Sequence, residues 1–163
     1  MERGRGAAAR PEETRIASLE AGPVFNLSLV TDRAQTARSS LARLRQLGAL
    51  SLAKFRALPD GYAVAEHHLR RALQGLLDLG RHMAVKSGWG NPSNYREIFD
   101  LLERNGVMPT ELAEKGRGLA GYRNRLVHEY AIVTEDELWG ILKNRLPDLD
   151  ELLLRLVEYA GQA

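Results

Sequence analysis

Hydrophobic residues recur every three or four positions from Val24 onward, which is the period of an amphipathic helix. Among the arginines and glutamines of the first such segment lie leucines at spacings of three or its multiples: Leu29, Leu41, Leu44, Leu47 and Leu50. After the turn-forming run Pro59-Asp60-Gly61, a second apolar stripe contains Val64, His68, Leu69, Ala72, Leu76, Leu79 and Met83. These segments predict two long helices that are separated by a turn following Leu58.

Three more helical segments follow. A short one carries Tyr95, Ile98, Phe99 and Leu102, and a fourth is expected from about Thr110 to beyond Tyr130. The fifth begins at Thr134, which forms a capping box with Glu137, and we expect Pro147 to kink or split it. Its apolar stripe is Leu138, Ile141, Leu142, Leu149, Leu152, Leu153 and Leu156. Because no stretch alternates with period two, we predict an all-α, up-and-down bundle of about five helices.

Composition narrows the class of protein. The 163 residues are enough for one domain, which we place at residues 23–163, after a disordered extension over residues 1–22 that is rich in arginine, glycine and alanine. The chain has no cysteine, which excludes disulfides, zinc–thiolate sites and thiol nucleophiles. A net charge of +2 permits an anionic partner without requiring one. No apolar run is long enough for a membrane helix, and no secretory signal precedes the domain, so we expect a cytoplasmic protein.

Metal and phosphate-loop chemistry find little support in the sequence. The four histidines are His67, His68, His82 and His128, and none has a metal-ligand spacing. We expect His68 and His82 to be partly buried helix residues. The Gly116-Arg117-Gly118 stretch lacks the ending of a phosphate-binding loop. We therefore predict neither a metal nor a cofactor.

The segment Gly121–Tyr130 stands apart because it combines an arginine, an amide, an imidazole and a phenol. On a helix at about 100° per residue, Asn124 and His128 are neighbours, and Tyr130 falls two turns after Arg123 on the same face. One interpretation is an ordinary exposed helix face. The other is phosphodiester chemistry, in which His128 moves a proton of a ribose hydroxyl and Arg123 holds the phosphate oxygens.

This segment resembles the Arg-x4-His motif of HEPN domains, and Tyr130 completes the Arg-x4-His-x-Tyr form of HepT-like toxins. Two other stretches are similar to the same family: Pro92–Phe99 and the helix around Leu69–Asp78. The resemblance covers roughly residues 24–160 and is most specific in Gly121–Tyr130.

The resemblance implies a dimeric helical protein that brings two Arg/His pairs into one cleft. It implies a metal-independent ribonuclease toxin in which Arg123 and His128 are catalytic and Asn124 is supporting. It also implies a nucleotidyltransferase antitoxin as partner, which transfers AMP onto Tyr130.

Two other functions stay open at this point. A non-catalytic HEPN module would bind a nucleotidyltransferase without cleaving RNA, and a helical protein could bind a nucleotide without catalysis. The sequence also leaves open whether a group of basic residues lines an RNA path or forms a solvated helix face: Arg43, Arg45, Lys54 and Arg56.

Overall fold

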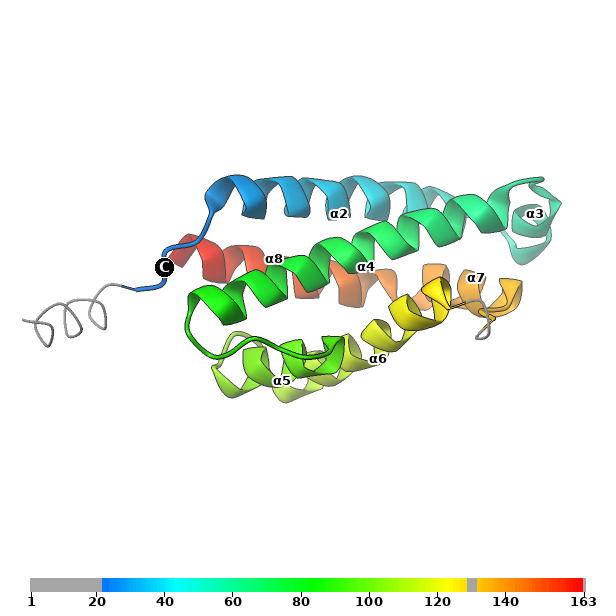
Figure 1. Ribbon diagram of the computed structural model, residues 1–163. Coiled ribbons are helices and arrows are strands. Elements are labelled where there is room, and N and C mark those ends of the chain that lie inside the picture. The colour runs from blue at the N-terminus through cyan, green and yellow to red at the C-terminus, as the bar shows by residue number, and fades with distance from the viewer. Residues whose placement is uncertain (1–21, 129–131, 163) are drawn as a thin grey trace, which may run out of the picture.

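The computed structural model describes residues 22–128 and 132–162, and over these residues it contains helices and no strand (Figure 1). The helices are α2 (Leu27–Gly48), α3 (Leu52–Ala57), α4 (Gly61–Lys86), α5 (Tyr95–Arg104), α6 (Thr110–Val127), α7 (Glu135–Asn144) and α8 (Leu146–Gln162). The predicted all-α class is confirmed. None of these helices is both long and apolar enough to cross a membrane.

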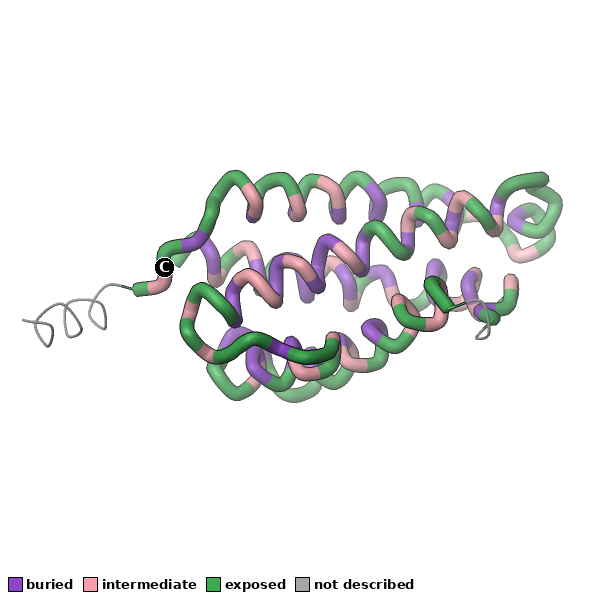
Figure 2. The backbone as a smooth tube through the Cα atoms, viewed as in Figure 1, coloured by how far each residue is buried: buried purple, intermediate pink, exposed green. Residues whose placement is uncertain are grey.

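The four longest helices, α2, α4, α6 and α8, form the body of the bundle. Helix α2 packs along α4, α8 contacts both of them, and α6 packs against α4 and α8. Figure 1 shows the small helices α3 and α7 together at one end of the bundle, with α5 beside α6 toward the other end. Buried residues line the inward faces of these helices (Figure 2), so the apolar stripes predicted from the sequence form one core.

Two of the five expected segments are each divided into two helices. The first is interrupted after Gly48, and α3 is capped by Ser51, whose hydroxyl accepts a hydrogen bond from the Lys54 N–H at 3.2 Å. The last is split at Arg145, with Pro147 in the first turn of α8. Proline suits that position because the first N–H groups of a helix have no intrahelical partner. The break predicted at Pro147 is confirmed.

The capping box predicted at Thr134 is half formed. The Thr134 hydroxyl accepts a hydrogen bond from the Glu137 N–H at 3.2 Å, as expected. The Glu137 carboxylate does not return to the Thr134 backbone; it binds Arg125 of α6 instead. An ion pair between two helices has therefore replaced the second bond of the capping box.

Helices α5 and α6 are held together by a close backbone approach. A Cβ atom added to Gly116 would lie 2.4 Å from the Phe99 ring, so only glycine fits at this point of α6. One residue later, Arg117 pairs with Asp100 and Glu103 of α5 at 3.0 and 2.9 Å. These contacts fix α5 against α6 and so determine where Tyr95, the first residue of α5, lies.

Candidate functional site

The end of α6 carries the residues that the sequence singled out. Arg123 and Asn124 lie in its last two turns, and the helix ends at Val127. His128 is the C-cap residue, with φ −93° and ψ 117°, and its N–H donates to the Asn124 carbonyl at 3.1 Å. The prediction that this helix continues beyond Tyr130 was wrong. Because the chain leaves the helical conformation at His128, helical spacing cannot place Tyr130, which lies outside the described residues.

Arg123 is held from two sides by other helices. Its Nε–H donates to Oε1 of Gln74 on α4 at 3.0 Å. Its guanidinium carbon lies 5.0 Å from the centre of the Tyr95 ring at the start of α5, within the range of a cation–π contact. In the part of the chain that the structure describes, Arg123 forms no ion pair with a carboxylate. Among the described residues, its positive charge is therefore held without being neutralised.

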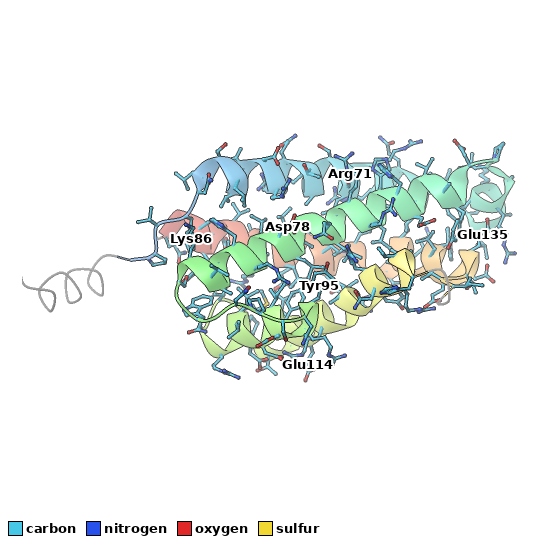
Figure 3. All side chains as sticks on the ribbon, in the orientation of Figure 1. Arg71, Asp78, Lys86, Tyr95, Glu114 and Glu135 are labelled. Atoms are coloured by element: carbon cyan, nitrogen blue, oxygen red, sulfur yellow. The ribbon has the colours of Figure 1, made fainter. Side chains whose placement is uncertain are left out.

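Further polar groups connect Gln74 to the other side of α4. Its Nε2 donates to Oδ1 of Asp78 at 2.7 Å, and Oδ2 of Asp78 lies 3.1 Å from Nε of Arg33 on α2. Figure 3 labels Asp78 beside α4, on the side facing α2, and Tyr95 between α4 and α5. A row of polar contacts therefore runs from α2 across α4 to Arg123.

His128 and Asn124 are both exposed. They are joined through the backbone, by the hydrogen bond that closes α6, and not by their side chains in the described structure. An exposed imidazole at a helix end, one turn from an exposed amide and five residues after a cationic guanidinium, can exchange protons with a ligand that Arg123 binds. The structure thus keeps Arg123, Asn124 and His128 at one end of one helix.

Arg125, between these residues in the sequence, has a structural role. Its two terminal nitrogens bind the Glu137 carboxylate at 2.5 and 2.9 Å, and Nη2 also donates to the Ile132 carbonyl at 2.9 Å. The hydrogen bonds with Arg125 lower the pKa of the Glu137 carboxyl. Tyr62 adds a second anchor, since its hydroxyl donates to the Val133 carbonyl at 2.6 Å. The chain is thus held at residues 132 and 133, just after the segment that follows His128.

Two other histidines, His68 and His82, act as parts of the fold. His82 accepts a hydrogen bond from the Asn26 N–H at 3.0 Å, and its ring lies 5.9 Å from that of Phe25. His68 lies 3.5 Å from the Ser40 hydroxyl. Burial lowers the pKa of both imidazoles. Among the described residues, no three His, Asp or Glu side chains are grouped as metal ligands.

Two of the four basic residues considered for an RNA path are neutralised by ion pairs between helices. Arg45 of α2 binds Asp150 of α8 at 2.5 Å, and Arg56 of α3 pairs with Glu135 at 3.6 Å and with Asp136. Arg43 donates to Gln46 at 2.8 Å. These contacts favour a solvated, salt-bridged surface over a continuous RNA path.

The sequence did not single out Gln74 as part of this site. Gln74 is one of two polar residues, with Asp78, in a mostly buried stretch of α4, and nothing in its local spacing relates it to a residue 49 positions later. Tyr95 was predicted only as a residue of a short helix and of a family-like segment, without a contact to Arg123. One feature of the sequence does indicate a polar contact of Gln74. A glutamine and an aspartate four residues apart on a helix can form a hydrogen bond.

Comparisons with known proteins converge on one group. Residues 37–156 match the family described as "Ribonuclease HepT-like". A curated relative, the mRNA nuclease HepT of Shewanella oneidensis, is 24% identical over 86 residues. That match covers 53% of this chain and 65% of the relative, so the aligned part spans slightly less than two thirds of the relative's length.

Solved structures share the fold. The tri-AMPylated HEPN toxin of Shewanella oneidensis, in complex with its MNT antitoxin, superposes with a TM-score of 0.73 at 19% identity, covering 80% of this chain and 97% of that one. A cytosolic protein of unknown function from Bacillus subtilis, YutE, superposes with a TM-score of 0.75 at 18% identity, covering 86% of this chain and 94% of that one. At these identities the structural likeness concerns the fold.

Proposed function

We propose that this chain, which belongs to the HepT-like ribonuclease family, cleaves RNA without a metal ion, with Arg123 as phosphate ligand and His128 as proton-transfer group. The observation that carries the proposal is the state of the Arg123 guanidinium. It is held by a neutral glutamine and an aromatic ring, and no carboxylate among the described residues neutralises it. His128 lies exposed at the end of the same helix. We assign Asn124 a supporting role, since its carbonyl accepts the His128 N–H at the end of α6.

The reaction follows from these groups and from the ribose of the substrate. The 2′-oxygen attacks the adjacent phosphorus, a new P–O bond forms and the bond to the 5′-oxygen breaks. An imidazole removes the 2′-OH proton, and an imidazolium returns a proton to the leaving 5′-oxygen. Arg123 donates two hydrogen bonds to the non-bridging oxygens as their charge increases. The products are a 2′,3′-cyclic phosphate and a free 5′-hydroxyl.

A two-fold dimer would supply the second imidazole. Each chain has one His128, whereas the reaction uses one base and one acid. In an isologous contact near the end of α6, His128 of one protomer and His128 of the partner subunit would face a shared cleft. Light scattering is expected to give the mass of a dimer at micromolar concentration, and a monomer that cleaves RNA would contradict the shared cleft.

The protein partner that we propose is a small nucleotidyltransferase acting as antitoxin. The support is the Shewanella oneidensis structure, whose toxin is AMPylated and bound to an MNT antitoxin. By analogy, we place an AMP acceptor at Tyr130. An AMP group there would add a negative charge seven residues after Arg123 in the sequence, and we propose that this charge repels RNA. Since YutE is described as cytosolic, we place this chain in the cytoplasm too.

The experiment that tests the function compares three proteins on a labelled RNA. The wild type and His67→Ala are expected to cleave it, because His67 is an exposed residue of α4 outside the site. His128→Ala should lose about 10²–10⁴-fold in rate, the usual contribution of general acid–base catalysis. If none of the three cleaves RNA while all bind the nucleotidyltransferase, the chain is a binding module and the proposal fails.

A further inference from the structure

The hydrogen bond between Gln74 and Arg123 connects two parts of the chain that lie 49 residues apart. Resting on the proposed function, we propose that Gln74 is a positioning residue for cleavage: it orients the Arg123 guanidinium toward the phosphate, and Asp78 in turn orients Gln74. Neither residue would touch the RNA. Their effect would pass through the direction in which the terminal nitrogens of Arg123 point.

The chemistry of Asp78 determines which way the Gln74 amide faces. An ionised carboxylate only accepts hydrogen bonds, so the group that Gln74 turns toward Asp78, at 2.7 Å, must be its NH₂. The carbonyl oxygen is then directed to the opposite side, where it accepts the Nε–H of Arg123 at 3.0 Å. A flipped amide would place a carbonyl against the carboxylate and an NH₂ against the guanidinium, and both contacts would be repulsive.

Asp78 is itself held by a third helix. Its oxygens are divided between two partners: Oδ1 accepts from Gln74, and Oδ2 lies 3.1 Å from Nε of Arg33 on α2. Because Oδ1 accepts a hydrogen bond from Gln74 and Oδ2 faces the Arg33 cation, rotation of the carboxylate would break one contact or the other. The orientation of Arg123 on α6 therefore depends on contacts made by α2 and α4.

The contact with Gln74 selects the edge of the guanidinium that remains for a ligand. Gln74 uses the Nε–H, and the Tyr95 ring lies 5.0 Å from the guanidinium carbon. The two Nη atoms are the pair that matches two oxygens of a phosphate. With one edge and one face in contact with protein, the guanidinium presents its Nη atoms in a restricted direction, and no carboxylate of residues 22–128 or 132–162 pairs with it.

This arrangement predicts a loss of turnover more than of RNA affinity when Gln74 is changed. Arg123 would keep its charge and still attract the RNA backbone, but its Nη atoms would no longer be aligned with the developing charge. Small misplacements of a catalytic group can reduce rates by up to about 100-fold. A general loosening of the bundle would instead lower the melting temperature, so the two causes can be separated.

The test uses the full chain and two variants with one matched control. Gln74→Met keeps the length of the side chain and removes the oxygen that accepts from Arg123. Asp78→Asn keeps the shape of the side chain but, since an amide can also donate, no longer fixes which way the Gln74 amide faces. Gln46→Met is the control, since Gln46 also accepts a hydrogen bond from an arginine, Arg43, at 2.8 Å on an exposed part of α2. Cleavage of a labelled RNA gives kcat and KM, and NMR gives the exchange rate of the Arg123 Nε–H, assigned by its loss in Arg123→Lys.

We expect Gln74→Met to lower kcat about tenfold or more with a smaller change in KM, and to speed exchange of the Nε–H about tenfold. Asp78→Asn should show the fall in kcat and the faster exchange more weakly. If Gln74→Met does not fold, the Asp78→Asn variant tests the positioning role of Gln74. Gln46→Met should match the wild type. Unchanged kcat and unchanged exchange in folded Gln74 and Asp78 variants would overturn the proposal. If the wild type does not cleave RNA, the proposed function fails. In that case the exchange rate of the Arg123 Nε–H still tests the positioning role of Gln74, and an unchanged rate in the variants refutes it.

Discussion

The Arg125 guanidinium and the Glu137 carboxylate form a two-pronged ion pair, with distances of 2.5 Å from Nη1 to Oε1 and 2.9 Å from Nη2 to Oε2. The pair joins the end of α6 to the first turn of α7, and so holds both ends of the connection that follows His128. Arg125 lies two residues after Arg123, yet among the described residues only Arg125 is paired with a carboxylate, whereas Arg123 contacts a glutamine and an aromatic ring. The role of an arginine in this motif therefore depends on the side chain that it contacts, and that contact is known only from the three-dimensional structure.

The Arg125–Glu137 pair should make stability depend on pH. The native pKa of Glu137 lies below its unfolded value, which is about 4.3. Its contribution is therefore fully present above that unfolded pKa and is lost as the pH falls through the lower native pKa. We expect Glu137→Gln to be less stable than the wild type at pH 7, and the difference to shrink toward pH 3. Chemical denaturation at pH 7 and at pH 3 measures this difference in the free energy of unfolding.

A matched control for this prediction is Glu151→Gln. Glu151 lies 4.0 Å from Arg155 on the same helix, at the surface, and such pairs contribute little. Its unfolding free energy should stay close to that of the wild type at neutral pH. A gap between wild type and Glu137→Gln that grows on acidification would contradict the assigned role of the pair.

The second prediction separates the positive charge of Arg123 from the planar shape of its guanidinium group. Arg123→Lys keeps the charge but replaces a planar fork by a single ammonium, which cannot donate two parallel hydrogen bonds to a phosphate. We expect cleavage to fall by about 10²–10³-fold, as for removal of a group that stabilises transition-state charge. Arg38→Lys on the exposed side of α2 is the control and should retain wild-type rates. Equal rates for both variants would remove Arg123 from the site.

The third prediction uses two glycines that lie two residues apart on α6. Alanine at Gly116 would place its Cβ 2.4 Å from the Phe99 ring, whereas a Cβ at Gly118 meets no atom within 4 Å. We expect Gly116→Ala to destabilise the fold by about 1–3 kcal/mol through overpacking. Gly118→Ala should stabilise it by about 0.5–1 kcal/mol, because alanine favours a helix. Thermal melts that move in the same direction would contradict the close packing of α5 on α6.

The helical class and most of the core follow from local periodicity. Leu138, Ile141 and Leu142, for example, were predicted to face the core and are buried. Two helix ends were not predictable in this way. The interruption after Gly48 depends on the Ser51 cap, which uses one hydroxyl and leaves little trace in hydrophobic spacing. The end of α6 at Val127 has no glycine or proline to mark it, so the hydrophobic pattern alone does not locate it.

The candidate site was predictable as a motif but not as an assembly. Arg123 and Asn124 lie in the last two turns of α6 and His128 caps its end, so their closeness along the chain follows from the sequence. Gln74 and Tyr95 reach Arg123 only because α4 and α5 pack against α6. Such contacts between distant parts of the chain follow from tertiary packing, and periodicity carries no information about them.

The fourth prediction concerns regulation through Tyr130, which lies outside the described residues. Co-expression with a nucleotidyltransferase that neutralises this chain should add AMP to its phenol, and the modified protein should be folded and inactive. Tyr130→Phe keeps the ring and removes the acceptor oxygen, so it should cleave RNA and resist silencing. Intact and peptide mass spectrometry locates the adduct. An unmodified Tyr130, together with full neutralisation of Tyr130→Phe by the same partner, would exclude this switch.

The most direct test of metal-independent cleavage by Arg123 and His128 is the chemistry of the product made in excess EDTA. A single RNA oligonucleotide is compared with a copy that carries 2′-deoxyribose at the cleaved nucleotide. We predict that the wild type cuts the all-ribose strand, leaves a 2′,3′-cyclic phosphate and a 5′-hydroxyl, and leaves the substituted strand intact at that position. Cleavage that stops in EDTA, or that cuts the deoxy-substituted position, would contradict the account.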